Sequence, residues 1–201
     1  MKNICILRLS ALGDCCHALS IVQALQRHLP DSHISWVINK NEYQLFRDIP
    51  RVDFIVVDKE NLAKSFSNIF FSNRKKVFDV LLNLHASASA NFISLAIRAD
   101  RKIGYDKARA RDKQNWFCDE YIQPASNQHV ADAMVGFLSY LDIKENRPSW
   151  SPLQLRPEEE IVKKYVSPDQ RMCLISPCSS QRYGDKYNRS WPVEKYIEII
   201  R

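Results

Sequence analysis

Short apolar runs alternate with longer amphipathic segments over most of the chain. The apolar runs predict strands at 3–9, 33–39, 53–58, 78–85 and 101–105. Between and after them, the patterns predict helices at 14–28, 41–47, 60–71, 88–98 and 129–142. Strands that alternate with helices in this way form a parallel sheet covered by helices. We therefore predict an α/β chain with a Rossmann-like first domain.

The helix predicted at 14–28 shows the clearest apolar stripe. Its apolar positions recur at helical spacing and share one face: Ala18, Ile21, Val22 and Leu25. Pro30 then ends the segment, because proline cannot continue a helix.

The pattern changes at residue 144, where three prolines fall within fourteen residues of weak periodicity. We predict a first domain over 1–143, a linker over 144–157 and the beginning of a second domain over 158–201. That last part predicts a helix at 157–166, a strand at 172–177 and a helix from Trp191. Because one strand and part of a helix cannot bury a core, we expect the second domain to be truncated and the chain to be a fragment.

Composition and charge narrow the class of protein. The chain has 201 residues, 45% of them apolar and 26% charged, which is ordinary for a globular protein. The excess of 29 basic over 23 acidic residues gives a net charge of +6, which favours anionic partners such as nucleic acid, lipid headgroups or phosphorylated sugars. No apolar run approaches the length of a membrane span, and six scattered cysteines fit reduced thiols. We expect a cytoplasmic protein.

Several phosphate-binding and catalytic motifs are excluded. The four glycines cannot form G-x-G-x-x-G or the P-loop motif, and neither HExxH nor GxSxG occurs. No two histidines stand four residues apart, so we expect no metal site. The missing glycine motifs argue against a nicotinamide dehydrogenase and a P-loop nucleotidase.

The turn between the first strand and the first helix is the strongest candidate site. Ser10 and Gly13 bring small side chains and backbone N–H groups to a helix N-terminus, which favours an anion. Asp14 brings a negative charge to the same place. Two interpretations stay open from the residues alone: Asp14 caps the helix, or it takes a proton from a substrate.

Three segments carry a resemblance to a known family. They are "ILRLSALGDCCHALSIVQALQRHLPDSHISWVI", "FDVLLNLHASASA" and "SPCSSQRYGDKYNRSWPVEKY". Their order and spacing resemble the family 9 glycosyltransferases, the ADP-heptose:lipopolysaccharide heptosyltransferases. The resemblance implies a GT-B fold, with two Rossmann-like domains and the active site in the cleft between them. It also implies that Asp14, in the S-x-x-G-D pattern, is the general base.

The resemblance extends to the reaction. It implies an inverting transfer of heptose from ADP-L-glycero-D-manno-heptose to the Kdo/heptose inner core of lipopolysaccharide, with no cofactor and no metal. Ser179 and Ser180 stand where family members meet the donor phosphates. Arg189 stands where many members carry lysine, and Lys186 is a rival for that role.

The acceptor side depends on positive charge. Residues 98–113 hold seven basic and three acidic residues, which fits either a solvated face or a site for Kdo carboxylates and lipid A phosphates. The candidates are Lys107, Arg109 and Arg111. Lys75 and Lys76 are candidates for attraction to the inner-membrane surface, at whose cytoplasmic face we expect the protein to lie peripherally.

The histidines allow two interpretations each. His17 follows Asp14 by one helical turn and lines either the cleft or the buried face of the helix. His85 ends a strand beside small residues and belongs either to the site or to the core. His129 opens a helix and fits a surface position.

Two other functions compete with the heptosyltransferase hypothesis. A GT-B transferase with another donor or acceptor would share the architecture, because a fold does not determine a substrate. A basic nucleic-acid-binding module is less favoured, because the aromatic residues follow core patterns and do not interleave with the basic run. We therefore expect no nucleic acid among the partners.

Overall fold

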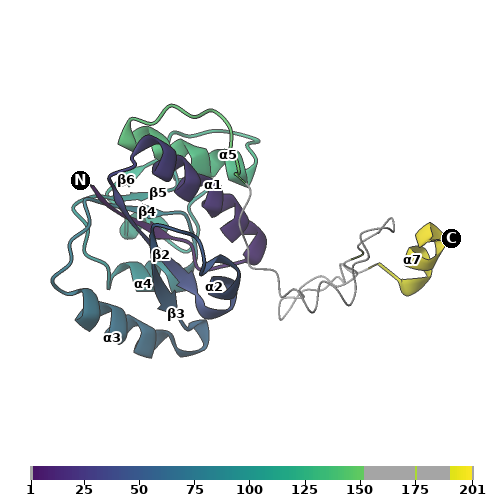
Figure 1. Ribbon diagram of the computed structural model, residues 1–201, viewed down its shortest axis with the longest axis horizontal. Coiled ribbons are helices and arrows are strands. Elements are labelled where there is room, and N and C mark those ends of the chain that lie inside the picture. The colour runs from purple at the N-terminus through teal and green to yellow at the C-terminus, as the bar shows by residue number, and fades with distance from the viewer. Residues whose placement is uncertain (1, 152–174, 176–190, 201) are drawn as a thin grey trace. The chain divides into compact units, whose positions relative to one another are not determined.

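A six-stranded parallel sheet forms the centre of the computed structural model, which describes residues 2–151, 175 and 191–200 (Figure 1). The strand order is β3-β2-β1-β4-β5-β6, and every neighbouring pair is parallel. The strands are β1 (Asn3–Leu7), β2 (His33–Asn39), β3 (Val52–Val57), β4 (Val80–Asn83), β5 (Lys102–Gly104) and β6 (Glu120–Tyr121). This order places β1 at the middle of the sheet, so the segment that follows β1 is central as well.

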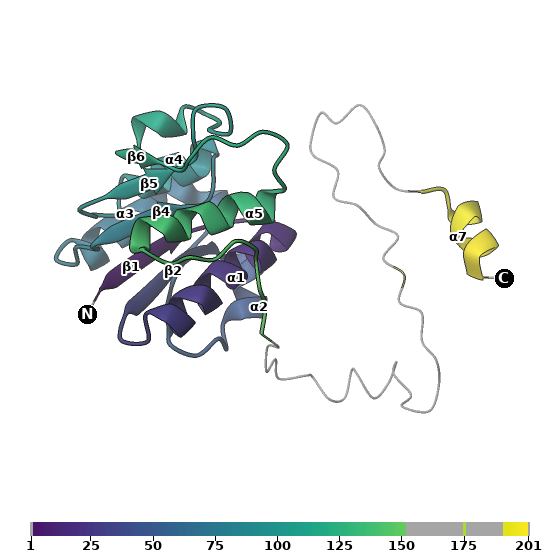
Figure 2. The same cartoon turned by 90° about the horizontal axis from the view of Figure 1, so that it is seen from above.

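Helices cover both faces of the sheet (Figures 1 and 2). One face carries α1 (Leu12–His28), α2 (Lys40–Phe46), α5 (Val130–Val135) and the 3-10 helix η3 (Gly136–Leu141). The other face carries α3 (Leu62–Asn73) and α4 (Ala88–Ser94). Two further 3-10 turns are η1 (Lys59–Asn61) and η2 (Gln114–Trp116). The result is the doubly wound arrangement of Rossmann-like domains.

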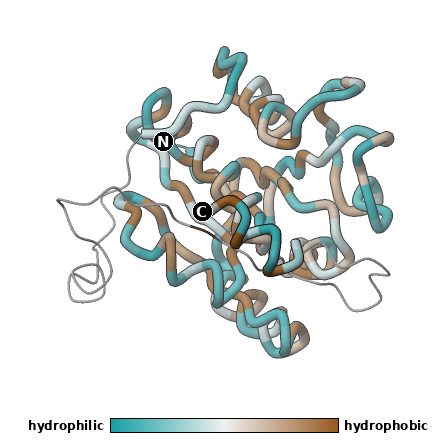
Figure 3. The backbone as a smooth tube through the Cα atoms, turned by 90° about the vertical axis from the view of Figure 1, so that its right-hand side faces the viewer, coloured by the Kyte–Doolittle hydropathy of each residue, from teal (hydrophilic) through white to brown (hydrophobic). Residues whose placement is uncertain are grey.

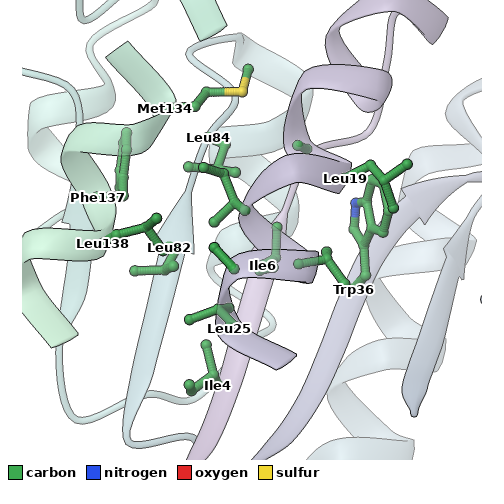
Figure 4. Packing of buried hydrophobic residues seen from close by; sticks show 14 of the residues in the cluster. Ile4, Ile6, Leu19, Leu25, Trp36, Leu82, Leu84, Met134, Phe137 and Leu138 are labelled. Carbon is green, nitrogen blue, oxygen red and sulfur yellow. The ribbon is translucent and has the colours of Figure 1, made fainter. Parts of the chain in front are cut away.

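The two faces of β1 enter separate apolar cores. Ile4 and Ile6 pack under α1, and Cys5 and Leu7 pack under α3 and α4, because successive strand residues point to opposite sides. All four are fully buried, which explains why β1 is an unbroken apolar run. Figure 4 shows the larger core, where Leu19 of α1 lies beside Trp36 of β2 and Leu138 of η3 lies beside Leu82 of β4.

The predicted α/β class and all five predicted strands are confirmed, with differences at element ends. The helix predicted from 14 begins at Leu12, and the helix predicted at 129–142 divides at Gly136 into α5 and η3. The helix predicted at 88–98 ends at Ser94. Figure 3 shows why the long helices were predictable, since hydrophobic and hydrophilic positions alternate along them. The two-residue β6 was missed because it is too short to show a period.

A segment at 145–151, here called the strap, lies along α1 (Figure 2). Glu145 accepts from Arg27 at 2.7 Å, and the Trp150 indole donates to the Cys16 carbonyl at 2.7 Å. The Gln23 side chain exchanges two hydrogen bonds with the Ser151 backbone, of 3.0 and 2.8 Å. These contacts fasten the first half of the predicted linker 144–157 to the first of the chain's two compact units, Met1–Leu155.

The second unit, Arg156–Arg201, is described over few residues. It contains α7 (Val193–Ile200), which agrees with the helix predicted from Trp191. Lys195 and Glu198 form an ion pair of 3.1 Å on this helix. The predicted helix at 157–166 and nearly all of the strand at 172–177 lie outside the described residues. Among the described helices, none combines the length and apolarity that crossing a membrane requires.

Candidate active site

The carboxyl ends of the parallel strands bring the candidate residues to one edge of the sheet. Ser10 follows β1, Lys59 follows β3 and His85 follows β4. The Lys59 ammonium donates to the Ser10 hydroxyl at 2.9 Å, and the Leu9 backbone N–H donates to Nδ1 of His85 at 3.2 Å. This edge is where open α/β sheets bind ligands. Lys59 was not among the predicted residues, although its place after a strand was a signal for it.

Asp14 lies at this edge in the first turn of α1. The N-cap of α1 is Ala11, with no side-chain cap, so the interpretation of Asp14 as the helix cap is wrong. The Asp14 carboxylate forms an ion pair with the Arg8 guanidinium through Oδ2. Its side chain is 34% exposed, against 9% for Arg8. A half-exposed carboxylate beside a buried cation is held in place and still accessible to a substrate.

Arg8, the ion-pair partner of Asp14, was also missed by the sequence reasoning. Its Nη1 donates to the Leu84 carbonyl at 2.6 Å, and its own carbonyl accepts from the Trp36 indole at 3.2 Å. These contacts hold both the backbone and the guanidinium of Arg8. A signal was present, because arginine interrupts the apolar run "ICILRL" six residues before the only acid of the first helical turn.

The other ionisable side chains near Arg8 are kept neutral. Burial raises the pKa of the Tyr105 phenol to about 12. Burial likewise raises the pKa of the Cys15 thiol to about 12. Neither group is ionised near neutral pH, so neither is suited to act as a base or a nucleophile there. The negative charge next to Arg8 therefore comes from the Asp14 carboxylate.

His17 lies in the packing between α1, α5 and the strap. Its ring centroid is 5.4 Å from that of His129 and 6.1 Å from that of Trp150, and its Nδ1 is buried with no hydrogen-bond partner among the described residues. Burial lowers the pKa of His17, Asp14 raises it, and His129 and Arg8 lower it further. His17 was predicted to line either the cleft or the buried face of the helix, and these contacts agree with the buried position. His129 is the N-cap of α5 and accepts from the Ala131 N–H.

The basic loop at 106–113 follows β5 and reaches the same edge. Asp112 holds it there by accepting from the Ala88 N–H at 2.8 Å, at the start of α4. The Arg109 guanidinium is already engaged by other groups of the protein. It contacts the Asp106 carboxylate, the Gln128 side chain and the Gln123 carbonyl. Lys107 and Arg111 are exposed and form no ion pair among the described residues. Their role in acceptor binding stays a prediction.

The remaining predicted residues divide into two groups. Gly13 is exposed in the first turn of α1, with open space where a Cβ would lie. The predicted donor-phosphate residues lie outside the described residues: Ser179, Ser180, Lys186 and Arg189. Within the described part of the chain, no three acidic, histidine or cysteine side chains are grouped to hold a metal ion.

The fold and the site together define a doubly wound α/β protein with an acid at the ligand-binding edge. Residues 71–201 match the sequence model of glycosyltransferase family 9 (heptosyltransferase), and the chain belongs to this family. It is 33% identical over 98% of its length to the lipopolysaccharide core heptosyltransferase OpsX of Haemophilus influenzae, covering 56% of that protein. The chain therefore spans about half the length of this relative.

Solved structures of the family share the fold. The glycosyl transferase family 9 structure from Veillonella parvula matches with a TM-score of 0.69 at 22% identity, over 84% of this chain and 51% of that one. The E. coli heptosyltransferase WaaC with ADP-2-deoxy-2-fluoro heptose matches with a TM-score of 0.69 at 17% identity, over 98% of this chain and 64% of that one. The predicted GT-B fold class is confirmed by these likenesses.

Proposed function

We propose that the chain carries the catalytic base and acceptor side of an inverting heptosyltransferase of lipopolysaccharide core synthesis. Its donor would be ADP-L-glycero-D-manno-heptose and its acceptor a Kdo or heptose sugar of the inner core. The observation that carries this proposal is the half-exposed Asp14 carboxylate held by the buried Arg8. Support comes also from the family and from the 33% identity to an enzyme named as a lipopolysaccharide core heptosyltransferase.

Asp14 acts as the general base. Its Oδ2 contacts Arg8, and its Oδ1 accepts no hydrogen bond from the described residues, which leaves one oxygen for the acceptor hydroxyl. As the hydroxyl oxygen bonds to the anomeric carbon, its proton passes to the Asp14 carboxylate. The bond from that carbon to the ADP oxygen breaks, and ADP leaves with the electron pair. Attack opposite the leaving group inverts the anomeric centre.

The positive charges at the carboxyl edge fit an anionic acceptor. Lys59 contacts Ser10 beside the start of α1, and the exposed Lys107 and Arg111 lie on the loop after β5. Cations attract carboxylates and phosphates, so these three side chains favour an acceptor such as Kdo on lipid A. Peripheral attachment to the inner membrane would bring the chain to this acceptor.

The donor phosphates need positive charge or hydrogen-bond donors as ADP leaves. We assign this role to Ser179, Ser180 and Arg189, with Lys186 as the alternative cation. Protein groups then replace a metal ion in this proposal, and no cofactor takes part.

The test is a transfer assay on the Asp14→Asn variant with ADP-heptose and a Kdo-bearing acceptor. We expect turnover to fall by roughly 10²–10⁴-fold, the contribution of a general base, with little change in melting temperature. Asp31→Asn is the matched control, because Asp31 is an exposed acid that precedes β2 at the opposite edge of the sheet.

Two results would contradict the proposal. One is an unchanged turnover of Asp14→Asn, which would leave the transfer without this base. The other is an equal loss of turnover in Asp14→Asn and in the control Asp31→Asn.

A further inference from the structure

A row of exposed and partly exposed apolar side chains lies on the sheet face that carries α3 and α4. We call it the aromatic ridge, and it consists of Phe66, Phe70, Phe71, Phe92 and Leu95. Phe71 is 66% exposed and Leu95 is 53% exposed. The inner side of α3 is occupied separately, by the buried Ser65 and Ile69. Phe70, Phe71, Phe92 and Leu95 therefore face outward, whereas the half-buried Phe66 also packs against the core.

The ridge is continuous between the two helices. The Phe66 ring stacks on the Phe92 ring of α4 at 4.8 Å and lies parallel to the Phe70 ring at 6.2 Å. The Phe70 and Phe71 rings meet edge to face at 5.5 Å. Contiguous apolar patches of this kind on a protein surface mark an interaction site.

The exposed charges on α3 and in the segments that follow α3 and α4 are mainly positive. Between Asn61 and Ala99 the sequence contains a single acid, Asp79, whose carboxylate accepts from the Asn3 N–H at 2.6 Å. The exposed cations of this region are Lys64, Arg74, Lys75 and Arg98. Arg98 donates to the Arg74 carbonyl at 2.8 Å, which joins the chain after α4 to the end of α3. These cations, here called the cationic border, lie at both ends of α3 and after α4, beside the apolar centre of the ridge.

Lys76, predicted as a membrane-facing cation, is turned inward. Its ammonium donates to the Ser35 hydroxyl at 3.1 Å and lies 4.9 Å from the centre of the buried Phe78 ring. Lys75 beside it is exposed. Of the two predicted lysines, Lys75 is therefore the one that faces outward with Arg74.

We propose that the aromatic ridge docks the chain on an anionic lipid bilayer. The phenyl rings and Leu95 enter the interfacial region, and Arg74, Lys75 and Arg98 meet the lipid phosphates. The docking surface deepens the proposed function, since an acceptor linked to lipid lies at such a surface, but the docking itself needs no transfer reaction.

Other occupants fit the ridge less well. A second copy of the chain would bring two cationic borders together, and like charges across an interface are unfavourable. A single-stranded nucleic acid would match the cations, but Leu95 offers no aromatic face for base stacking. Lipid satisfies both the apolar centre and the cationic border.

Vesicle co-sedimentation of the chain tests the docking surface. We expect binding to vesicles with about one third phosphatidylglycerol and little binding to pure phosphatidylcholine, because anionic lipid supplies about 1 kcal/mol per cation near the surface. Arg74→Gln with Lys75→Gln should weaken the partition coefficient by about 25-fold, or about fivefold per cation. Phe70→Ser with Phe71→Ser should weaken it by at least about tenfold, because two exposed rings lose their burial in lipid.

Leu45→Ser with Arg47→Gln provides the matched control. Both residues are exposed at α2 on the opposite face of the sheet, and this pair should bind vesicles like the unaltered chain. Circular dichroism and melting temperature would show that all three double variants are folded.

The proposal would be overturned if the ridge and control variants bound vesicles equally, or if the chain showed no preference for anionic vesicles. It would also be overturned if the chain bound no vesicles and the ridge instead formed a dimer or bound an oligonucleotide. A transfer assay with a delipidated, water-soluble acceptor tests the proposed transfer reaction separately from membrane docking. Ridge variants should retain full turnover there, and Asp14→Asn should not.

Discussion

At the scale of single residues, the ion pair of Arg8 and Asp14 joins a buried cation to an accessible acid. The guanidinium is satisfied on one side by the Leu84 carbonyl and on another by Asp14. A buried charge is retained at a cost, and the pairing with Asp14 offsets that cost. Only 9% of the Arg8 side chain is exposed, so we predict that it acts on the reaction through Asp14. It is a positioning residue, because its contacts determine where the Asp14 carboxylate lies.

Arg8→Met should reduce turnover by about 10²-fold, since a base displaced by about 1 Å loses that much. Arg8→Lys should recover part of this loss, because lysine keeps the charge next to Asp14 without the hydrogen-bond geometry of guanidinium. Steady-state kinetics on both variants, with melting temperatures as the reference for folding, would check this. If Arg8→Met and Arg8→Lys lose turnover only in proportion to their stability, Arg8 has no positioning role.

At this scale the sequence indicated the acid but not its partner. Asp14 was predicted from the turn and the family pattern, and its exposure agrees with a site role. Arg8 was missed because a cation next to an apolar run shows no partner until the chain folds. For Arg109 the sequence indicated a residue of a basic run that could bind an anion. The fold instead pairs its guanidinium with Asp106, Gln123 and Gln128.

At the scale of elements, the junction of α1, α5 and the strap places a histidine in a site unsuited to positive charge. His17 is packed against His129 at the N-terminus of α5 and against Trp150 of the strap. A helix N-terminus disfavours a cation. Burial is the largest cause of the lowered pKa of His17, with Asp14 as the opposing charge.

This junction predicts a loss of stability in mild acid. Below a pH of about 6.5 the unfolded chain binds a proton at His17, whereas the folded chain binds it only at lower pH. The unfolded state therefore holds more protons in this window, and the free energy of unfolding falls as the pH falls through it.

Urea denaturation at pH 7 and pH 5 would measure the effect. The His17→Gln variant should show a smaller decrease between the two pH values than the unaltered chain. Equal decreases in both proteins would assign the acid sensitivity to other groups.

Elements were predictable where they were long and periodic. α1 and α3 carry their stripe over three or more turns, so their existence was clear from the sequence. β6 has two residues, and it forms because Gly104 of β5 lets Cys118 approach: a Cβ on Gly104 would lie 2.7 Å from the Cys118 sulfur. Such an approach depends on tertiary packing and leaves no period in the sequence.

At the scale of the whole molecule, the strap is packed against the first unit. The linker was predicted from residue 144 because the prolines there show no periodicity. In the fold, Glu145, Trp150 and Ser151 are bound to side chains or carbonyls of α1. The same residues that lack a pattern are therefore part of the packed unit.

A comparison of two shortened chains would test this. A chain that ends at 143 should be less stable than one that ends at 151 by about 2 kcal/mol, the sum of four partly exposed hydrogen bonds of about 0.5 kcal/mol each. Its melting temperature should be lower by about 5 °C for a domain of this size. Thermal unfolding followed by circular dichroism gives both values, and identical melting curves would show that the strap does not stabilise the unit.

The amino-acid sequence by itself determined the parallel α/β architecture, the placement of Asp14 at a strand end and the resemblance to family 9. These follow from periodicity and local motifs, which depend on residues close together in the chain. Only the tertiary structure decided that Arg8 holds Asp14, that Lys76 turns inward while the phenylalanines of α3 and α4 form a surface, and that the strap belongs to the first unit. Each of these joins groups from different elements, and contacts of that kind exist only once the chain has packed.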